Sequence, residues 1–218
     1  MTDILTELGL DKPEERPSER AMTGIFTATA ADVAVVKLVD GSEAIMPRNE
    51  FFENTQWQTG WQVAVILLGT DPRPVVSAVR PEVVSGLYLG VTPELRDGRV
   101  KIMSVARAAG DRTKIAVAST TEEIDAVGAM VGRKANRARL VSDRLRGERI
   151  DIIAWHNDPA TFVGNALAPA KVREVRIDGD SATAVVDAHQ MSAAVGSGGV
   201  NTLLASELTG FNVTIEAA

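Results

Sequence analysis

The chain has no cysteine and few aromatic residues, which make up 4% of its 218 positions. The absence of cysteine excludes disulfides and thiolate metal sites, and it is typical of a protein from a reducing compartment. No apolar run approaches the roughly 20 residues that a membrane-spanning helix needs. The first residues also lack the basic and then apolar order of a signal peptide. We therefore expect a cytoplasmic protein with no membrane contact.

The net charge of −6 is unevenly distributed along the chain. Residues 99–150 contain 12 Lys or Arg and 6 Asp or Glu, a balance of +6. The flanking segments are acidic, with balances of −7 for residues 1–98 and −5 for residues 151–218. A basic block between acidic neighbours can bind phosphate locally, while repulsion at longer range limits non-specific binding. The alternative is a solvated basic helix face that binds no ligand.

Hydrophobic residues make up 45% of the chain, which is enough for packed cores. Residues 1–20 are rich in charge and contain prolines, so we expect a flexible tail there. Between residues 21 and 80 the pattern changes to short strands broken by turns, such as the tight turn at Asp40-Gly41. Five short strands in about 60 residues are typical of a small closed barrel, with the OB-fold as the leading candidate. The expected strands cover residues 22–28, 33–39, 43–47, 61–68 and 75–79.

One unit occurs twice in the C-terminal half: a short apolar helix, a glycine loop, a second helix and a strand. The first loop is Gly132-Arg133-Lys134-Ala135, and the second is Gly196-Ser197-Gly198-Gly199. A helix–GXXG–helix element is how KH domains hold single-stranded nucleic acid. Its glycines let the backbone approach the sugar-phosphate chain, and the second helix offers its N-terminal amides to phosphate.

A helix and two strands are expected before each of these copies, which gives both units the order α-β-β-α-α-β of a type II KH domain. The first of these helices is interrupted at Pro93, and the second starts with Asp158 as N-cap and Pro159 at its first position. The expected fold class is α+β: a small all-β OB-fold barrel followed by two tandem type II KH domains. The expected domains are the tail (1–20), the barrel (21–80), the first KH domain (81–155) and the second KH domain (156–218).

Residues 99–218 contain several distinctive stretches, which are GDRTKIAV (110–117), DAVGA (125–129), GERIDI (147–152), PATFV (159–163), APA (168–170) and LASELTGF (204–211). These stretches resemble the NusA family of bacterial transcription elongation and termination factors. They follow one another in the family's order, which makes the resemblance specific. The barrel resembles the family's S1-type OB domain more weakly, mainly through GSEAIMP at 41–47.

The chain also departs from the family's pattern. Family members begin with a helical domain that docks on RNA polymerase, whereas residues 1–20 alone precede the barrel here. The first loop ends in Ala135 where the family has glycine, so we expect its backbone to stay near the helical region. Ser197 stands where the family usually has a basic residue. The resemblance therefore implies a divergent member without the N-terminal polymerase-binding domain.

The candidate RNA-binding residues lie on the two loops, on the helices that follow them and on the strand before the first loop. Basic side chains of the first unit would contact phosphates, and the second unit would rely on backbone amides and one asparagine. The predicted set is Gly132, Arg133, Lys134, Ala135, Asn136, Arg137, Arg139, Arg112, Lys114, Gly196, Ser197, Gly198, Gly199 and Asn201.

The sequence contains no pattern that supports catalysis, a metal site or a cofactor. His156 and His189 have no second metal-type pair near them in sequence. Ser142 and Ser206 each precede an acidic residue on an expected helix, but they lack a credible base or oxyanion loop. The glycine loops lack the Lys-Ser/Thr ending of a phosphate-binding P-loop. We therefore predict that the protein is not an enzyme.

The leading functional hypothesis is a non-enzymatic protein that binds single-stranded, nascent RNA and modulates transcription elongation, termination or antitermination. RNA would follow a groove made by both loops, and the expected partners are this RNA and RNA polymerase or other transcription factors. The alternative is a protein–protein adaptor or competitor that has kept the KH fold and lost most RNA binding. A ribosome-associated RNA chaperone would use the same surfaces. Nothing in the sequence requires more than a monomer.

Overall fold

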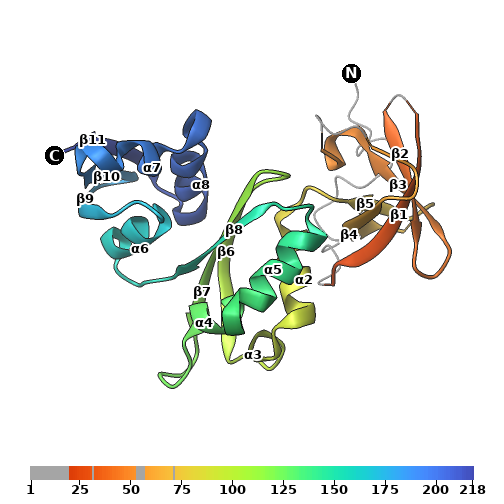
Figure 1. The fold of residues 1–218 in the computed structure, drawn as a ribbon, viewed down its shortest axis with the longest axis horizontal. Helices are drawn as coiled ribbons and strands as arrows, with labels where there is room; N and C mark the ends of the chain where they lie inside the picture. The colour runs from red at the N-terminus through yellow and green to blue at the C-terminus, as the bar shows by residue number, and fades with distance from the viewer. Residues whose placement is uncertain (1–19, 31, 53–56, 71) are drawn as a thin grey trace. The chain divides into compact units, whose positions relative to one another are not determined.

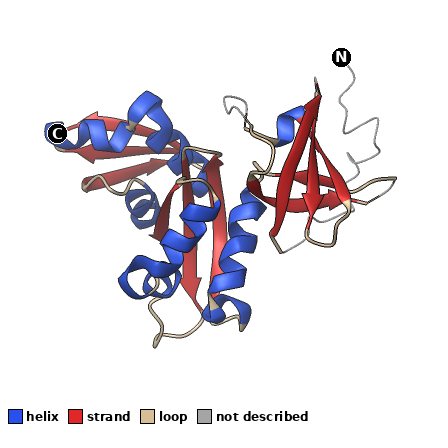
Figure 2. Cartoon of the chain, turned by 45° about the vertical axis from the view of Figure 1, so that its right-hand side comes forward, coloured by secondary structure: helices blue, strands red, loops and turns tan. Residues whose placement is uncertain are grey.

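The computed structural model describes residues 20–30, 32–52, 57–70 and 72–218, so nearly all of the expected tail lies outside the described residues. The chain divides into two compact units. The first comprises residues 1–91 and 143–147, and the second comprises residues 92–142 and 148–218. Figure 1 shows the order of the elements, and Figure 2 shows that strands dominate the N-terminal part, whereas helices and strands alternate in the C-terminal part.

The first unit contains a closed barrel with the strand order β1-β2-β3-β5-β4, in which β4 pairs back with β1. Alternating side chains of β2 point inward, among them Ala34 and Val36, each 0% exposed, because successive residues of a strand face opposite sides. This closed arrangement confirms the predicted OB-like barrel. The strands are β1 (Met22–Ala30), β2 (Val33–Leu38), β3 (Glu43–Pro47), β4 (Gln62–Gly69) and β5 (Val75–Ser77).

The last barrel strand is shorter than expected and ends at Ser77. The Ser77 hydroxyl accepts hydrogen bonds from the amides of Val79 and Arg80, both at 3.1 Å, and so turns the chain. Helix α2 (Pro81–Val91) then begins with proline at its first position. The Arg80 guanidinium binds the carboxylate of Glu50, which is 1% exposed, and thereby ties the end of the barrel to the short 3-10 helix η1 (Arg48–Glu50).

The second unit contains two three-stranded sheets. In one, β7 (Arg112–Ser119) lies between antiparallel β6 (Val100–Ala108) and parallel β8 (Arg149–Ala154). In the other, β10 (Ser181–Val186) lies between antiparallel β9 (Val172–Asp178) and parallel β11 (Asn212–Ala217). The same topology twice confirms the predicted strand order of two type II KH units. The ladders cover most of each strand, with one shift of register between β6 and β7 and one between β9 and β10.

Each sheet is accompanied by the predicted helices on either side of a glycine loop. The helix expected at 81–97 is divided as predicted, because Thr92 separates α2 from α3 (Pro93–Arg96). The Asp158 carboxylate caps α6 (Pro159–Ala166) by accepting a hydrogen bond from the Thr161 amide at 2.9 Å, as expected for an N-cap. The other α-helices of this part of the chain are α4 (Ala126–Val131), α5 (Asn136–Arg144), α7 (Met191–Val195) and α8 (Val200–Thr209).

The two sheets of the second unit share one hydrophobic core. It includes Ala116 and Ile153 from the first sheet and Phe162, Leu204 and Val213 from the second KH unit. Polar bonds reinforce this packing: the Ser104 hydroxyl donates to the carbonyl of Leu208 at 2.8 Å. Because the core is continuous, the two glycine loops are carried by a single packed body. None of the helices among the described residues has the length and apolar character that crossing a membrane requires.

Candidate nucleic-acid interface

The two glycine loops have the same backbone conformation. The first glycines agree closely, with φ 74° and ψ 168° at Gly132 and φ 78° and ψ 169° at Gly196. The third positions are both left-handed, with φ 53° at Lys134 and φ 61° at Gly198. The loops therefore share one shape, although the second has glycine where the first has lysine.

Ala135 also lies in the left-handed region, with φ 58°. The expectation that its backbone stays near the helical region is therefore wrong. Left-handed φ brings Cβ close to the following carbonyl oxygen, so a residue other than glycine adopts it where its surroundings over-determine the backbone. Here the loop is fixed at both ends, because α4 ends at Val131 and α5 starts at Asn136.

The first glycine of each loop is required by the helix that follows. A Cβ on Gly196 would lie 2.7 Å from the Cβ of Asn201 and 2.8 Å from its backbone nitrogen. A Cβ on Gly132 would lie 2.7 Å from the Cγ of Arg137. Side chains are excluded from these points because the backbone passes so close to the first turn of the second helix.

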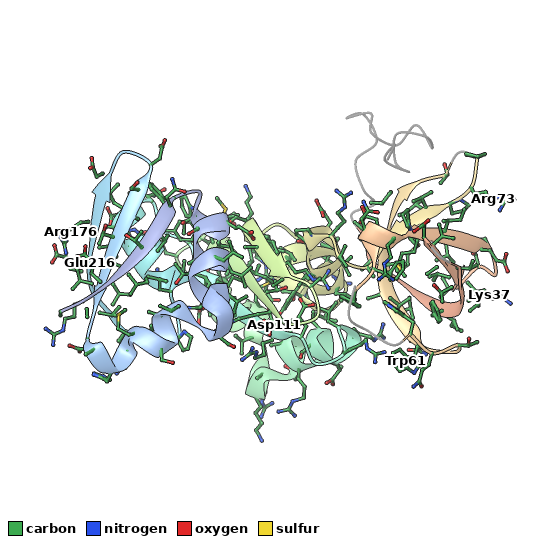
Figure 3. The ribbon with its side chains drawn as sticks, turned by 90° about the horizontal axis from the view of Figure 1, so that it is seen from above. Lys37, Trp61, Arg73, Asp111, Arg176 and Glu216 are labelled. Atoms are coloured by element: carbon green, nitrogen blue, oxygen red, sulfur yellow. The ribbon has the colours of Figure 1, made fainter. Side chains whose placement is uncertain are left out.

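Many basic side chains of residues 99–150 are neutralised by acidic partners. Arg107 binds Glu148 with its Nη2 at 2.9 Å from Oε2, and both side chains are 0% exposed. Arg149 binds Asp111 at 2.8 Å near the surface, where Figure 3 labels Asp111. The basic residues of this segment that take part in ion pairs are Arg99, Arg107, Arg112, Lys114, Arg137 and Arg149.

Six basic residues of this segment form no ion pair among the described residues, and three of them lie at the first loop, the others being Lys101, Arg144 and Arg146. Arg133, Lys134 and Arg139 are exposed and form no ion pair within the described part of the chain. Asn136 and Ala135 are exposed beside them. The structure thus brings these predicted residues together on the loop and the first turns of α5.

Arg137 does not belong to this exposed group. Its Nη1 donates to the carboxylate of Glu94 at 2.7 Å and to the carbonyl of Ala129 at 2.6 Å. Hydrogen bonds from the backbone amide of Glu94 and from Arg137 hold the pKa of the Glu94 carboxyl below its usual value. The prediction that Arg137 contacts RNA is therefore corrected, since the guanidinium is already bound within the protein.

Arg112 and Lys114 are likewise engaged, so their predicted RNA contacts do not fit the structure. The Lys114 side chain is 0% exposed, and its ammonium donates to the Ala168 carbonyl at 2.8 Å and to Asp151 at 3.2 Å. Burial lowers the pKa of Lys114, and the negative charge of Asp151 opposes this shift. The Nε of Arg112 lies 2.6 Å from the same carboxylate.

Asn201 is also buried, at 0% exposure, which overturns its predicted contact with RNA. Its Nδ2 donates to the carbonyls of Leu167, Ala193 and Ala194 at 3.1, 3.2 and 2.9 Å. In the second loop, Ser197 and Gly198 are exposed, whereas Gly196 and Gly199 are partly buried. The second loop therefore presents backbone and one hydroxyl, with no charge.

An open groove of about 730 Å³ lies between α4 and β8 of the first KH unit and α6 and β9 of the second. Its walls include Val127 and Ile152 from the first unit and Gly164 and Val175 from the second. Asn165 lies at the rim and donates to the carbonyl of Ala154 at 3.0 Å. Sequence reasoning missed these residues because segments far apart in the chain meet here and leave no local pattern.

The barrel aromatics mostly pack within the barrel. Phe26 and Phe51 are 2% and 3% exposed, and Trp57 contacts both rings, with centroids at 5.3 and 5.9 Å. Trp61, labelled in Figure 3, is covered by the guanidinium of Arg146, 3.6 Å from the ring centroid. These rings stabilise the first unit and leave little free surface for base stacking.

The histidines are not arranged as metal ligands. His156 accepts a hydrogen bond from the Asp158 amide at 3.0 Å, which places it in the turn before α6. Within the described ranges, no three His, Asp or Glu side chains are grouped so that they could hold a metal ion.

Comparison with known proteins agrees with this architecture. Residues 79–155 match the NusA-like first KH domain, and residues 159–218 match the NusA-like second KH domain. The chain is 36% identical over 206 residues to the transcription termination/antitermination protein NusA of Bacillus subtilis strain 168, covering 91% of this chain and 55% of that protein.

Two other relatives carry the same name. The protein of Thermus thermophilus is 34% identical, with 91% of this chain and 53% of that protein covered. The protein of Mycobacterium tuberculosis strain H37Rv is 38% identical over 199 residues, with 86% and 57% covered. The chain thus spans about half the length of the relatives that it matches. With both KH domains matched and this identity along most of its length, the chain belongs to the NusA family.

Proposed function

We propose that the chain is a non-enzymatic factor in transcription termination or antitermination and that it binds single-stranded RNA at the first glycine loop. One observation carries this proposal: three of the six basic residues of 99–150 that form no ion pair among the described residues gather at that loop, namely Arg133, Lys134 and Arg139. The names of the relatives support the process, and the KH architecture supports the ligand.

The RNA backbone approaches at Gly132, where no side chain can stand. The N-terminus of α5, where the helix dipole is positive, faces the phosphate, and Arg133 and Lys134 add positive charge beside it. Each phosphate neutralised on a single strand contributes about −0.7 to the slope of log affinity against log salt concentration. Binding is therefore strongly dependent on salt.

The bases would lie in the groove described above, which the first KH unit lines with α4, the helix before the loop, and with β8. Val127 on α4 and Ile152 on β8 offer an apolar wall, against which a base can stack or pack. The groove continues to α6 and β9 of the second KH unit, so a single strand can pass from one unit to the next. The second loop then contacts the backbone through Gly198 and Ser197, with little dependence on salt because neither is charged.

The decisive experiment is fluorescence polarisation with short single-stranded RNAs at several salt concentrations. The variant Arg133→Ser with Lys134→Gly gives the two middle positions of the first loop the residues of the second loop, and Ala135 is unchanged. Since Lys134 is left-handed, glycine there relieves strain and the fold is retained. We expect weaker binding and a salt slope that is less steep by about 1.4, for two lost phosphate contacts.

Lys37→Ser is the matched control, because Lys37 is an exposed lysine on barrel strand β2 (Figure 3). It should leave the affinity and the slope unchanged. If the loop variant binds as tightly as the wild-type protein with the same slope, the first loop is not the site. If the wild-type protein binds none of the RNAs, the proposed function fails.

A second candidate is a contact with RNA polymerase or another transcription protein through the second KH unit. The chain has no Lys or Arg after Arg176, and Leu203 on α8 is 57% exposed, which favours an uncharged contact. Binding to polymerase that is independent of RNA and of salt, and that is lost in Leu203→Ser, would support this role. We propose that the protein acts as a monomer in either case.

A further inference from the structure

Arg137 and Asn201 occupy the same position in the two KH units. Each stands five residues after the first glycine of its loop, Gly132 or Gly196, in the first turn of the helix that follows. Their side chains differ in size and charge, and both point back into the protein rather than out to the surface. Arg137 is 23% exposed and Asn201 is 0% exposed.

Both side chains bind the end of the helix before the loop. Arg137 donates to the carbonyl of Ala129 at 2.6 Å, and Asn201 donates to the carbonyl of Ala193 at 3.2 Å. Ala129 and Ala193 each stand three residues before the first glycine. Carbonyls in the last turn of a helix have no partner within that helix, so these bonds satisfy acceptors that would otherwise be free.

Each side chain also reaches a third element. Arg137 binds the carboxylate of Glu94 on α3 at 2.7 Å, and Asn201 binds the carbonyl of Leu167 directly after α6 at 3.1 Å. Both α3 and α6 stand before the first strand of their sheet. The two helices on either side of a loop are thereby fixed to each other and to the helix at the start of the unit.

The loop between them needs this support. Lys134 and Ala135 have left-handed backbones, which residues other than glycine keep only where the surroundings hold them. The bonds of Arg137 connect the helix at one end of the loop to the helix at the other. Glu94 also neutralises the guanidinium, so Arg137 adds little to the field that a phosphate experiences at the loop.

We propose that Arg137, together with Glu94, and Asn201 are positioning residues that hold the two loops in the conformation that receives RNA, without contacting RNA themselves. This inference rests on the proposed RNA-binding function of the loops. Glu94 gives the sharper test, because two effects of its removal oppose each other. If only charge matters, removal of this carboxylate strengthens RNA binding. If Glu94 holds Arg137 in place, its removal weakens RNA binding.

The test compares Glu94→Ala and Arg137→Ala with the wild-type protein in RNA binding at several salt concentrations. We expect each variant to lower the affinity about tenfold with an unchanged salt slope. Glu123→Ala is the control, since Glu123 is an exposed carboxylate in the same unit, and it should bind RNA as tightly as the wild-type protein or more tightly. A slope in Arg137→Ala that is less steep by about 0.7 would instead identify a direct phosphate contact and overturn the proposal.

Amide hydrogen exchange without RNA gives an independent reading. The amides of Gly132 and Ala135 donate to the carbonyls of Gly128 and Gly132 at 2.8 and 3.0 Å, so they report the loop conformation. We expect faster exchange at both amides in Glu94→Ala and in the milder Glu94→Gln, and no change in the control. Unchanged exchange in both variants would contradict the proposal that Glu94 and Arg137 hold the loop. If neither the wild-type protein nor any variant binds RNA, the proposed function fails. The exchange rates would still decide whether Glu94 and Arg137 hold the loop.

Discussion

Ala135 and Gly199 close the two glycine loops with the same left-handed backbone, at φ 58° and φ 80°. Glycine adopts this region without strain, whereas an alanine there costs about 1–2 kcal/mol relative to right-handed φ. The first loop therefore keeps the shape of the second despite a sequence that opposes it. Substitutions at these two positions therefore measure how strongly the flanking helices hold the loop in its left-handed conformation.

Ala135→Gly should stabilise the protein by about 0.5–1 kcal/mol. The substitution relieves the left-handed strain, and the greater freedom of glycine in the unfolded chain offsets part of the gain, by about 0.4–1 kcal/mol. Urea unfolding monitored by circular dichroism measures the change in the free energy of unfolding.

The reverse substitution, Gly199→Ala, should destabilise the protein by a similar amount. Space does not limit it, because a Cβ on Gly199 would meet nothing within 4 Å. A stabilising effect of Gly199→Ala would mean that the loop relaxes to right-handed φ, and the strain argument would then be wrong for both loops.

Local sequence signals were sufficient for most of the fold. Prolines at positions 81, 93 and 159 mark helix starts, and each is the first residue of a helix in the structure. The Asp40-Gly41 turn forms as expected, with φ 88° at Gly41 and the Asp40 carboxylate accepting from the Ser42 amide. Such signals act within a few residues, so the sequence contains them in readable form.

Local sequence signals did not predict which polar side chains bind partners within the protein. Lys114, Arg137 and Asn201 each bind a partner at least 34 residues away in the chain. A basic residue on a strand or helix looks the same in sequence whether it faces solvent or a carboxylate from another element. The predicted interface therefore combined the two glycine loops with side chains that belong to the packing beneath them.

Glu148→Ala should be strongly destabilising, by about 3–5 kcal/mol, because it removes the carboxylate from a buried ion pair with Arg107. Glu148 also accepts from the amide of Gly110 at 2.8 Å and from the hydroxyl of Thr113 at 2.5 Å. A typical domain is stable by about 5–15 kcal/mol, so this single change removes a large part of the total. Thermal unfolding would measure it.

The control for that experiment is Asp111→Ala, which breaks the exposed pair with Arg149. Ion pairs in solvent contribute little, so its unfolding temperature should stay close to that of the wild-type protein. Equal effects of the two substitutions would contradict the role assigned to burial.

Asn201→Asp should destabilise the second KH unit by about 3 kcal/mol. Aspartate has nearly the shape of asparagine but replaces the donating amide with an oxygen that faces the carbonyls of Leu167, Ala193 and Ala194. Asn212→Asp makes the same chemical change at an exposed position and should have little effect. If both variants unfold at the same urea concentration, the Asn201 bonds do not stabilise the unit.

The buried Lys114 predicts a dependence of stability on pH. Its ordinary pKa is 10.5, and burial lowers the pKa in the folded protein, while the unfolded chain keeps the ordinary value. At pH values between the lowered pKa of the folded protein and 10.5, the unfolded chain binds more protons than the folded one. The free energy of unfolding therefore rises with pH in this range. Lys114→Met removes this titration and keeps an unbranched side chain of similar length.

The wild-type protein should therefore gain stability relative to Lys114→Met as the pH rises toward 10.5, and the difference should be constant well below the lowered pKa. Urea unfolding of both proteins at a series of pH values from about 7 to about 10 measures this difference, in which groups common to both cancel. The opposite trend would mean that Asp151 and the Ala168 carbonyl stabilise the ammonium by more than its burial costs. The Lys114 pKa would then be raised, and its bonds would be a net source of stability at neutral pH.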